Sequence, residues 1–465
     1  MRVQDIPDLA QLSWPDQGNL VRATNETLVR LGQDNRARPW LLSRWSASSD
    51  LRSWTFEVRD GVRWSNGDAL TAQQVAWNIR RWIDEAIGSH MKGRMGGLSS
   101  SGVRVQSSHR LQLSFDLPKL GLPAALGHYN AAIAHPASRG RWGANQPGTG
   151  PFRLVSHLAD EGARFVARQD YWGPGPFVDE LQFIDMGDDS SQKLAALASG
   201  QVDLVDSLGA GDIAGARTER LQIHEIPTGS TAVARMKVTR KAFTDRRVRK
   251  AMRLAIDPAA VVAAVRSART SPAEHHHMAP IHEDYPSLPR VGQNLREARQ
   301  LMAEAGWPQG FSTELNVNRD PPWNRELAQA MQGMWSRIGI NVRLNVLPGA
   351  QFWESWDQTD FGLTPWAHRP YALQILNLAY RSGQPWNDSE YSSSTLDRLL
   401  DEASRITDPV QRRPIMARIG KHMLEEGPIC QPIWIWAVTA SSSRLRGFQM
   451  HPTGEIHAEE LWLDG

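Results

Sequence analysis

A run of imidazole and carboxylate side chains stands out past the middle of the chain. Residues 274–277 read Glu-His-His-His, and residues 282–284 read His-Glu-Asp. In an extended segment His275 and His277 would share one face, where a metal ion could find two imidazoles and a carboxylate. Adjacent histidines are poorly spaced for tetrahedral ligation. We therefore expect them to form hydrogen bonds or to line a polar cleft rather than to hold a metal.

Two further segments combine aromatic, cationic and proline residues. Residues 364–370 read Thr-Pro-Trp-Ala-His-Arg-Pro, and residues 380–387 read Tyr-Arg-Ser-Gly-Gln-Pro-Trp-Asn. Tryptophan rings form apolar walls for ligands, and a guanidinium group binds a carboxylate through two parallel hydrogen bonds. The pattern is typical of a recognition surface. It fits equally a structural loop whose arginine pairs with a carboxylate of the protein.

The sequence contains no short motif of a catalytic mechanism. We find no phosphate loop, no G-x-G-x-x-G dinucleotide fingerprint, no H-E-x-x-H and no G-x-S-x-G elbow. Acidic residues are plentiful, but no pair of them is singled out as acid and base by the sequence. These observations favour a binding protein over an enzyme, and they point to no cofactor.

Composition indicates a folded chain of two or three domains without a nucleic-acid partner. The 465 residues are too many for one core, and 41% are hydrophobic against 22% charged. Fifty-two basic and fifty acidic residues leave a formal charge of +2, which gives no concentrated basic face. Cys430 is the single cysteine, which excludes an internal disulfide and a cysteine-based metal site.

The pattern of predicted secondary structure differs between the two halves of the sequence. In the first half, Trp54, Phe56 and Val58 alternate with polar residues like a half-buried strand, and a capping box at Thr71 predicts a helix. The breaker cluster at residues 146–151 suggests a crossing between domains. The second half alternates predicted helices with strands, which indicates α/β packing. Its predicted helices begin at Asn294 and Asp408 and cover residues 327–338, and its predicted strands cover residues 342–346 and 432–438.

The N-terminus shows no export signal, and no segment reaches the length of a membrane span. Residues 1–5 lack a basic start, an apolar core and a small-residue cleavage site. Apolar runs fall far short of the roughly 20 residues that a span requires. We expect a soluble chain that is either cytosolic or exported with its signal removed.

Several stretches, taken in order, resemble the solute-binding proteins of peptide and nickel ABC importers, the large bacterial family 5. The match runs from about residue 20 to the C-terminus. Its landmarks are residues 25–31 (Asn-Glu-Thr-Leu-Val-Arg-Leu), 38–45, 54–68, 70–77, 148–152 (Gly-Thr-Gly-Pro-Phe), 170–173 (Asp-Tyr-Trp-Gly), 243–252 and 338–342 (Ile-Gly-Ile-Asn-Val).

The resemblance implies an α/β, two-lobed periplasmic-binding-protein fold of the type II-like, large class, with a ligand cleft between the lobes. Lobe one would comprise residues 1–28, 148–228 and 432–465. An extra domain, residues 29–147, would be inserted into it, and lobe two would span residues 229–431. The breaker cluster at residues 146–151 agrees with one of these borders, and the change to alternating helices and strands after about Thr231 agrees with another.

The function implied by the resemblance is capture without catalysis. A monomeric periplasmic receptor would close on a peptide or peptide-like small solute and deliver it to an ABC permease in the inner membrane. One alternative within the family is a nickel-type metal or metal-chelate carrier that uses the histidines at residues 275–277. An alternative from another class is a hydrolase that acts on peptides.

One departure from the family pattern bears on the ligand. Dipeptide- and oligopeptide-binding members usually place an aspartate in the lobe-two loop, where it pairs with the amino group of the peptide. The corresponding residues 366–370 contain no acid, and they contain His368 and Arg369 instead. A basic pair suits a carboxylate or phosphate of the ligand better than an ammonium group.

The predicted ligand-binding residues are accordingly aromatic, amide and basic side chains from both lobes, without a metal site. They are Trp14, Asn19, His128, Tyr129, His275, His276, Trp366, His368, Arg369, Trp386 and Asn387.

Overall fold

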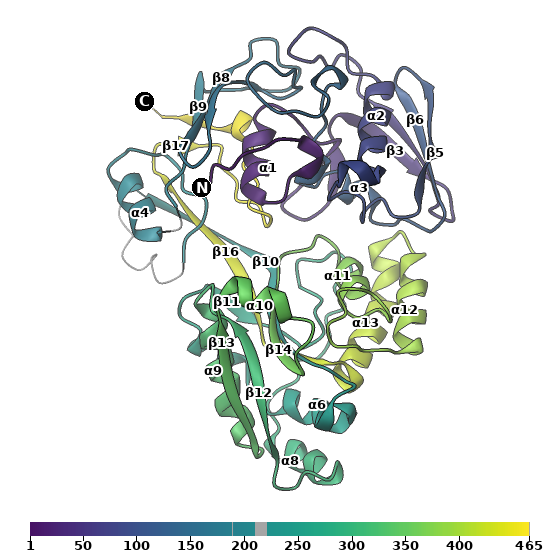
Figure 1. Ribbon diagram of the computed structural model, residues 1–465, viewed down its shortest axis with the longest axis vertical. Helices are drawn as coiled ribbons and strands as arrows, with labels where there is room; N and C mark the ends of the chain where they lie inside the picture. The colour runs from purple at the N-terminus through teal and green to yellow at the C-terminus, as the bar shows by residue number, and fades with distance from the viewer. Residues whose placement is uncertain (188, 210–220, 465) are drawn as a thin grey trace. The chain divides into compact units, whose positions relative to one another are not determined.

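The computed structural model describes residues 1–187, 189–209 and 221–464, which divide into two compact units (Figure 1). Unit 1 comprises Met1–Leu208 with residues 221–225 and 439–464, and unit 2 comprises Gly209 with residues 226–438. The chain passes from unit 1 to unit 2 within strand β10 (Leu221–Met236) and returns within β16 (Ile433–Ser442). The finer division into three domains, with the borders given above, stays a prediction. Among the described helices, none is long and apolar enough to cross a membrane.

One part of unit 1 is a four-stranded antiparallel sheet covered by a helix. The strand order is β3 (Leu42–Ala47), β4 (Ser53–Val58), β6 (Arg110–Phe115) and β5 (Leu98–Ser107). In β4 the buried residues are Trp54, Phe56 and Val58, so the predicted alternation is confirmed. The predicted helix is α2 (Ala72–Ile83), and its capping box between Thr71 and Gln74 is present.

The rest of unit 1 surrounds a second hydrophobic core. A three-stranded sheet of β7 (Phe152–Leu158), β8 (Gly162–Ala167) and β9 (Glu180–Ile184) supplies Phe152 and Phe165 to this core. Helix α1 (Pro15–Arg22) adds Leu20 and Val21, and the C-terminal segment adds Leu461. The remaining elements of unit 1 are β1 (Val29–Leu31), β2 (Ala37–Pro39), α3 (Leu122–Ala125), α4 (Ser190–Ala198), β17 (Leu445–Arg446) and β18 (Trp462–Leu463).

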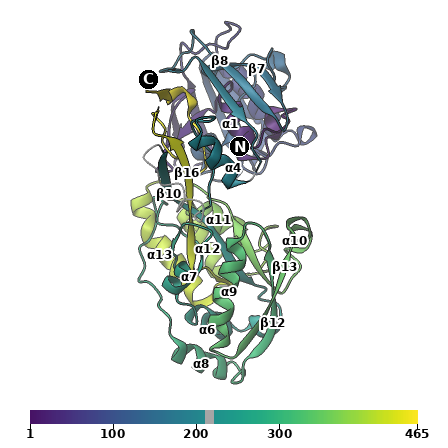
Figure 2. The same ribbon diagram turned by 90° about the vertical axis from the view of Figure 1, so that its left-hand side faces the viewer.

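Unit 2 is built on a mixed seven-stranded sheet. The order is β11 (Thr270–Pro272), β16, β10, β14 (Phe361–Trp366), β12 (Phe311–Asn318) and β13 (Ile340–Leu347), and β15 (Ile429–Cys430) pairs with β10. Strand β12 runs parallel to β13 and β14, whereas β10 and β14 are antiparallel. Helix α9 (Trp323–Ser336) packs on β12 and β13 (Figure 2).

The helices predicted for the second half of the sequence are present in unit 2. Asn294 caps α8 (Leu295–Glu304), and Asp408 caps α13 (Pro409–Glu426). The predicted strand at residues 432–438 is the inner strand β16, although Ile435, Trp436 and Ala437 are only half-buried. The remaining helices are α6 (Arg246–Leu254), α7 (Pro258–Ala264), α10 (Gly349–Ser355), α11 (Ala372–Ala379) and α12 (Ser394–Ser404). Short 3-10 helices lie at Leu9–Gln11, Glu85–Ile87, Tyr129–Ala131, Pro136–Ser138, Lys241–Thr244 and Ala458–Glu460.

The histidine run is buried inside unit 2 and is fixed to the strand end at Gln431. The Gln431 N–H donates to His275 Nδ1 at 2.8 Å, and the His277 N–H donates to the Gln431 side-chain oxygen at 3.0 Å. His277 Nδ1 also lies 2.6 Å from the Tyr380 hydroxyl. Burial lowers the pKa of His275 and of His277 to about 3, and that of His276 to about 4.

Acid should therefore destabilise the protein well above the pH at which carboxylates titrate. The unfolded chain takes up a proton at each histidine near pH 6.5, whereas the folded protein keeps these three imidazoles neutral down to about pH 4. Because the unfolded state binds more protons in this window, the free energy of unfolding should fall as the pH drops, by about 1.4 kcal/mol per pH unit for each histidine. Urea unfolding between about pH 7 and about pH 4 measures this slope.

The variant His277→Asn should reduce the pH dependence of the free energy of unfolding by the contribution of one histidine, about 1.4 kcal/mol per pH unit. Asparagine tolerates the left-handed backbone of this position, where φ is +59°. The matched control is Gln358→Asn, at an exposed position of the same unit without an ionisable group, which should leave the slope unchanged. Equal slopes for the parent protein and His277→Asn would contradict the assignment of the neutral state to His277.

Candidate functional site

The loop at residues 366–370 is held on unit 2 by two imidazoles. His368 Nδ1 accepts the Gly229 N–H of β10 at 2.8 Å, and the His368 N–H donates to the Ser230 hydroxyl at 3.0 Å. His282 accepts the Ala279 N–H on its Nδ1, so its proton lies on Nε2. His282 Nε2 then donates to the Arg369 carbonyl at 2.9 Å. The loop is thereby fixed both to the sheet and to the histidine-rich segment.

The backbone at Gly229 lies close to both imidazole rings. A Cβ atom there would lie 3.1 Å from His368 Nδ1 and 3.4 Å from His282 Nε2. The first contact is tight, so a side chain at residue 229 would require the His368 ring to shift by a few tenths of an ångström, whereas the second is an ordinary van der Waals contact.

The structure brings Trp366 and Trp386 together, as members of the predicted site on unit 2. Their ring centroids are 5.9 Å apart, and the rings of Trp366 and His277 are also 5.9 Å apart. Trp366 is 5% exposed and Trp386 is 48% exposed. Trp366 Nε1 is a buried donor without a hydrogen-bond partner among the described residues.

His368, Arg369 and Asn387 differ in how their polar groups are used. The bond from Gly229 places the proton of a neutral His368 on Nε2, and protonation of Nδ1 would break that bond. Arg369 is half-buried, and its Nη1 lies 3.4 Å from the His368 carbonyl. The Asn387 amide donates to the Arg381 and Tyr391 carbonyls and accepts the Ser389 hydroxyl and the Tyr391 N–H. Both ends of this amide are thus engaged within its own loop.

His275 and His276 lie in the interior of unit 2, with no exposed surface. Their Nε2 atoms have no hydrogen-bond partner among the described residues. A ligand contact by either ring would require the packing around it to move, and this role stays a prediction. In the part of the chain that the structure describes, no group of three histidine, cysteine, aspartate or glutamate side chains is arranged to hold a metal ion.

In unit 1, His128 and Tyr129 come together near the backbone of Ser13, the residue before Trp14. Trp14 is the residue before α1 and is 59% exposed. The Tyr129 hydroxyl donates to the Ser13 carbonyl at 3.1 Å, and the rings of His128 and Tyr129 are 4.3 Å apart. Arg94 joins this group, with Nη2 2.9 Å from His128 Nε2. No signal in the sequence marks Arg94 as a member of the group.

The fourth predicted residue of unit 1, Asn19, lies apart from this group. It is on α1 but is buried, and its side chain donates to the Gly454 carbonyl at 3.0 Å and accepts the Ile456 N–H at 3.0 Å. Asn19 thus attaches the C-terminal segment to α1.

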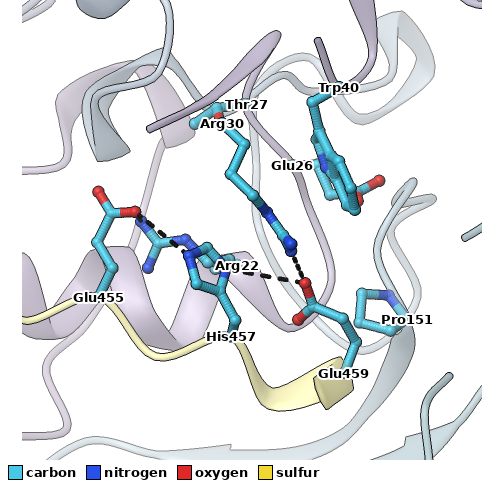
Figure 3. Close-up of a pocket in the computed structure, with 9 residues that line it drawn as sticks. All are labelled: Arg22, Glu26, Thr27, Arg30, Trp40, Pro151, Glu455, His457 and Glu459. Carbon is cyan, nitrogen blue, oxygen red and sulfur yellow. Dashed lines mark hydrogen bonds and ion pairs between the residues drawn. The ribbon is translucent and has the colours of Figure 1, made fainter. Parts of the chain in front are cut away.

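A small cavity in unit 1 is lined by paired charges (Figure 3). Arg22 pairs with Glu455 at 3.2 Å, Arg30 pairs with Glu459, and the Arg30 guanidinium lies 3.8 Å from the centroid of the Trp40 ring. The volume of about 10 Å³ suffices for a single water molecule. These contacts hold the C-terminal segment, and the cavity is too small for a solute.

Glu26 lies beside this cavity, inside the landmark at residues 25–31. Its carboxylate accepts the Trp40 and Trp172 indole N–H groups at 2.8 and 2.9 Å and the Tyr171 hydroxyl at 2.8 Å. Burial raises the pKa of Glu26, although these donors oppose the shift. This landmark therefore joins parts of unit 1.

Comparison with known proteins shows one family across most of the chain. The family model described as "Bacterial extracellular solute-binding proteins, family 5 Middle" matches residues 36–388. The dipeptide-binding protein DppE of Bacillus subtilis (strain 168) is 22% identical over 494 residues, covering 97% of this chain and 88% of DppE. The glutathione-binding protein GsiB of Escherichia coli (strain K12) is 22% identical over 469 residues, covering 94% of this chain and 88% of GsiB.

The solved structure of HbpA2 from Haemophilus parasuis is similar to the whole chain. Its TM-score is 0.86 at 22% identity, and the match covers 99% of this chain and 98% of HbpA2. The predicted α/β, two-lobed periplasmic-binding-protein fold is thereby confirmed. Because the family model spans well over half of the sequence, this chain belongs to the bacterial extracellular solute-binding proteins of family 5.

Proposed function

We propose that this protein is the solute-binding component of an ABC importer and that its ligand is a peptide or peptide-like solute with an anionic group. It captures the ligand between its two lobes, in the periplasm and as a monomer, and delivers it unchanged to a membrane permease. DppE and GsiB are named for dipeptide and glutathione, which supports a ligand of this class.

The observation that carries the proposal is the chemistry of the loop at residues 366–370. The loop contains no carboxylate, and it is anchored through His368 and through the Arg369 carbonyl. A fixed backbone limits the entropy that Arg369 loses when it binds an anion. A guanidinium group pairs with a carboxylate through two hydrogen bonds, which an ammonium group of a ligand cannot accept.

The proposal also includes the predicted residues of unit 1. Trp14 and Tyr129 offer ring surface there, and His128 with Arg94 adds polar groups. The lobes close around the ligand by bending of the two strands that connect them, β10 and β16.

Arg369→Ala should abolish the preference of the protein for a free carboxylate. The probes are the tripeptide Ala-Ala-Ala and its C-terminal amide, measured by calorimetry. Loss of one charge-assisted partner in a closed site should weaken binding of the free acid by about 2–4 kcal/mol, which is about thirtyfold or more. The amide should bind the parent protein and the variant with similar affinity.

The control for Arg369→Ala is Arg319→Ala, an exposed arginine of the same unit. If Arg369 served only an ion pair of the protein, its removal would lower the melting temperature and leave the carboxylate preference intact. Affinity within about threefold of the parent protein, in both Arg369→Ala and Trp366→Ala, would place the site elsewhere.

Ligand should compact the protein, because closure brings two lobes together. Small-angle X-ray scattering should show a smaller radius of gyration when a peptide that binds the parent protein is present at saturation. Arg369→Ala at the same peptide concentration should keep the larger radius. An unchanged radius for the saturated parent protein would contradict closure, and peptide cleaved beyond one equivalent per chain would contradict capture without catalysis.

A further inference from the structure

Four tryptophans of unit 2 form a contiguous row, which we name the tryptophan row: Trp353, Trp356, Trp366 and Trp386. Centroid distances along it are 5.9 Å from Trp366 to Trp386, 6.3 Å from Trp386 to Trp356 and 6.0 Å from Trp356 to Trp353. Trp366 ends β14, Trp353 belongs to α10, and the other two lie in the loops that follow α10 and α11.

The row runs from the interior of unit 2 to its surface. Trp366 is 5% exposed, Trp356 is half-buried, and Trp386 and Trp353 are 48% and 47% exposed. The three ring pairs are inclined at 45°, 70° and 64°, so that the rings do not stack face to face on one another. Indole rings that are not stacked on one another keep a face for another planar group, and a contiguous exposed apolar patch is a mark of a binding surface.

One buried guanidinium group connects the chain segments that carry the tryptophan row. Arg235 of β10 is fully buried, and it donates to the Trp356 carbonyl, to the Thr359 carbonyl and to the Asp388 carboxylate. The same Asp388 oxygen accepts the Thr364 hydroxyl at 2.9 Å. The network therefore includes the backbone of Trp356 itself. It also includes Thr364, two positions before Trp366, and Asp388, two positions after Trp386.

Such a network pre-organises the exposed rings. A buried ion pair adds little net stability compared with apolar residues of the same volume, and this pair connects the segments that carry the row. Loops that are held in place lose less entropy when a ligand binds to their side chains. Trp366 adds a buried indole N–H without a partner among the described residues, next to the loop that carries Arg369.

We propose that the tryptophan row is a platform that stacks with a planar, aromatic part of the ligand. This inference rests on the proposed function and narrows its ligand class. The occupant is a peptide or peptide-like anion with at least one aromatic ring system, whose anionic group is bound at Arg369. Continuity of the row with Trp366, three residues from Arg369, favours this occupant over a protein partner.

The test compares two carboxylates that have the same carbon skeleton. 2-Naphthoate is planar and aromatic, whereas decahydro-2-naphthoate is saturated and puckered, so their affinities separate stacking from general hydrophobicity. The parent protein should bind 2-naphthoate about tenfold more tightly, with quenching of tryptophan fluorescence. Trp386→Leu and Trp353→Leu should each reduce this preference about threefold, which is within the worth of one aromatic pair.

The matched control is Trp462→Leu, at a tryptophan of unit 1 that is 43% exposed. It should retain the full preference, and melting curves should show that all three variants fold, because the substituted rings are exposed. An equal affinity of the parent protein for the two probes, or an unchanged preference in Trp386→Leu and Trp353→Leu, would overturn the proposal. A row that served a protein partner would give the first of these results.

The outcome is separable from that of the proposed function. A parent protein that binds Ala-Ala-Ala but has no preference for 2-naphthoate keeps the proposed function and loses the platform. The opposite result is a preference for 2-naphthoate that depends on Trp386 and Trp353, without binding of any peptide. It would support the platform and contradict a peptide as the ligand.

Discussion

The hydrogen bond from the Gly229 N–H to His368 Nδ1 determines where the candidate site of unit 2 lies. Gly229 belongs to β10, the strand through which the chain enters unit 2, and His368 follows the end of β14. Because β10 and β14 are paired, this bond fixes the loop directly to the sheet. A buried N–H left without its acceptor costs about 1–3 kcal/mol, which is enough to hold a short loop in one conformation. Trp366 is placed by the strand pairing itself, opposite Thr231, and Arg369 follows the anchored His368 and is held at its carbonyl by His282.

Neutral imidazoles serve throughout unit 2 as hydrogen-bonding side chains of the interior. His275, His277 and His282 each contact a backbone group or a hydroxyl, and burial lowers the pKa of all three. An uncharged imidazole loses much less hydration than a buried cation, and it can still accept an N–H. His282 thus holds the loop at residues 366–370, and His277 packs against Trp366.

Charge is used differently in the two units. Around the cavity of Figure 3, Arg22 and Arg30 form ion pairs with glutamates of the C-terminal segment, so that both charges are neutralised within unit 1. In unit 2, the Arg235–Asp388 pair is buried at the base of exposed tryptophans. The first arrangement joins chain segments that are distant in sequence, and the second orders a surface.

Local patterns in the sequence determined the type of many elements, and ordered landmarks determined the family. The alternation at Trp54–Val58 and the capping box at Thr71 act over a few residues, so the sequence alone predicts β4 and the start of α2. The tertiary structure decided the roles of single side chains. Asn19 meets Gly454 across 435 positions, and Arg235 meets Asp388 across 153. Hydrogen-bond partners and burial arise only when distant segments pack, and no local propensity encodes them.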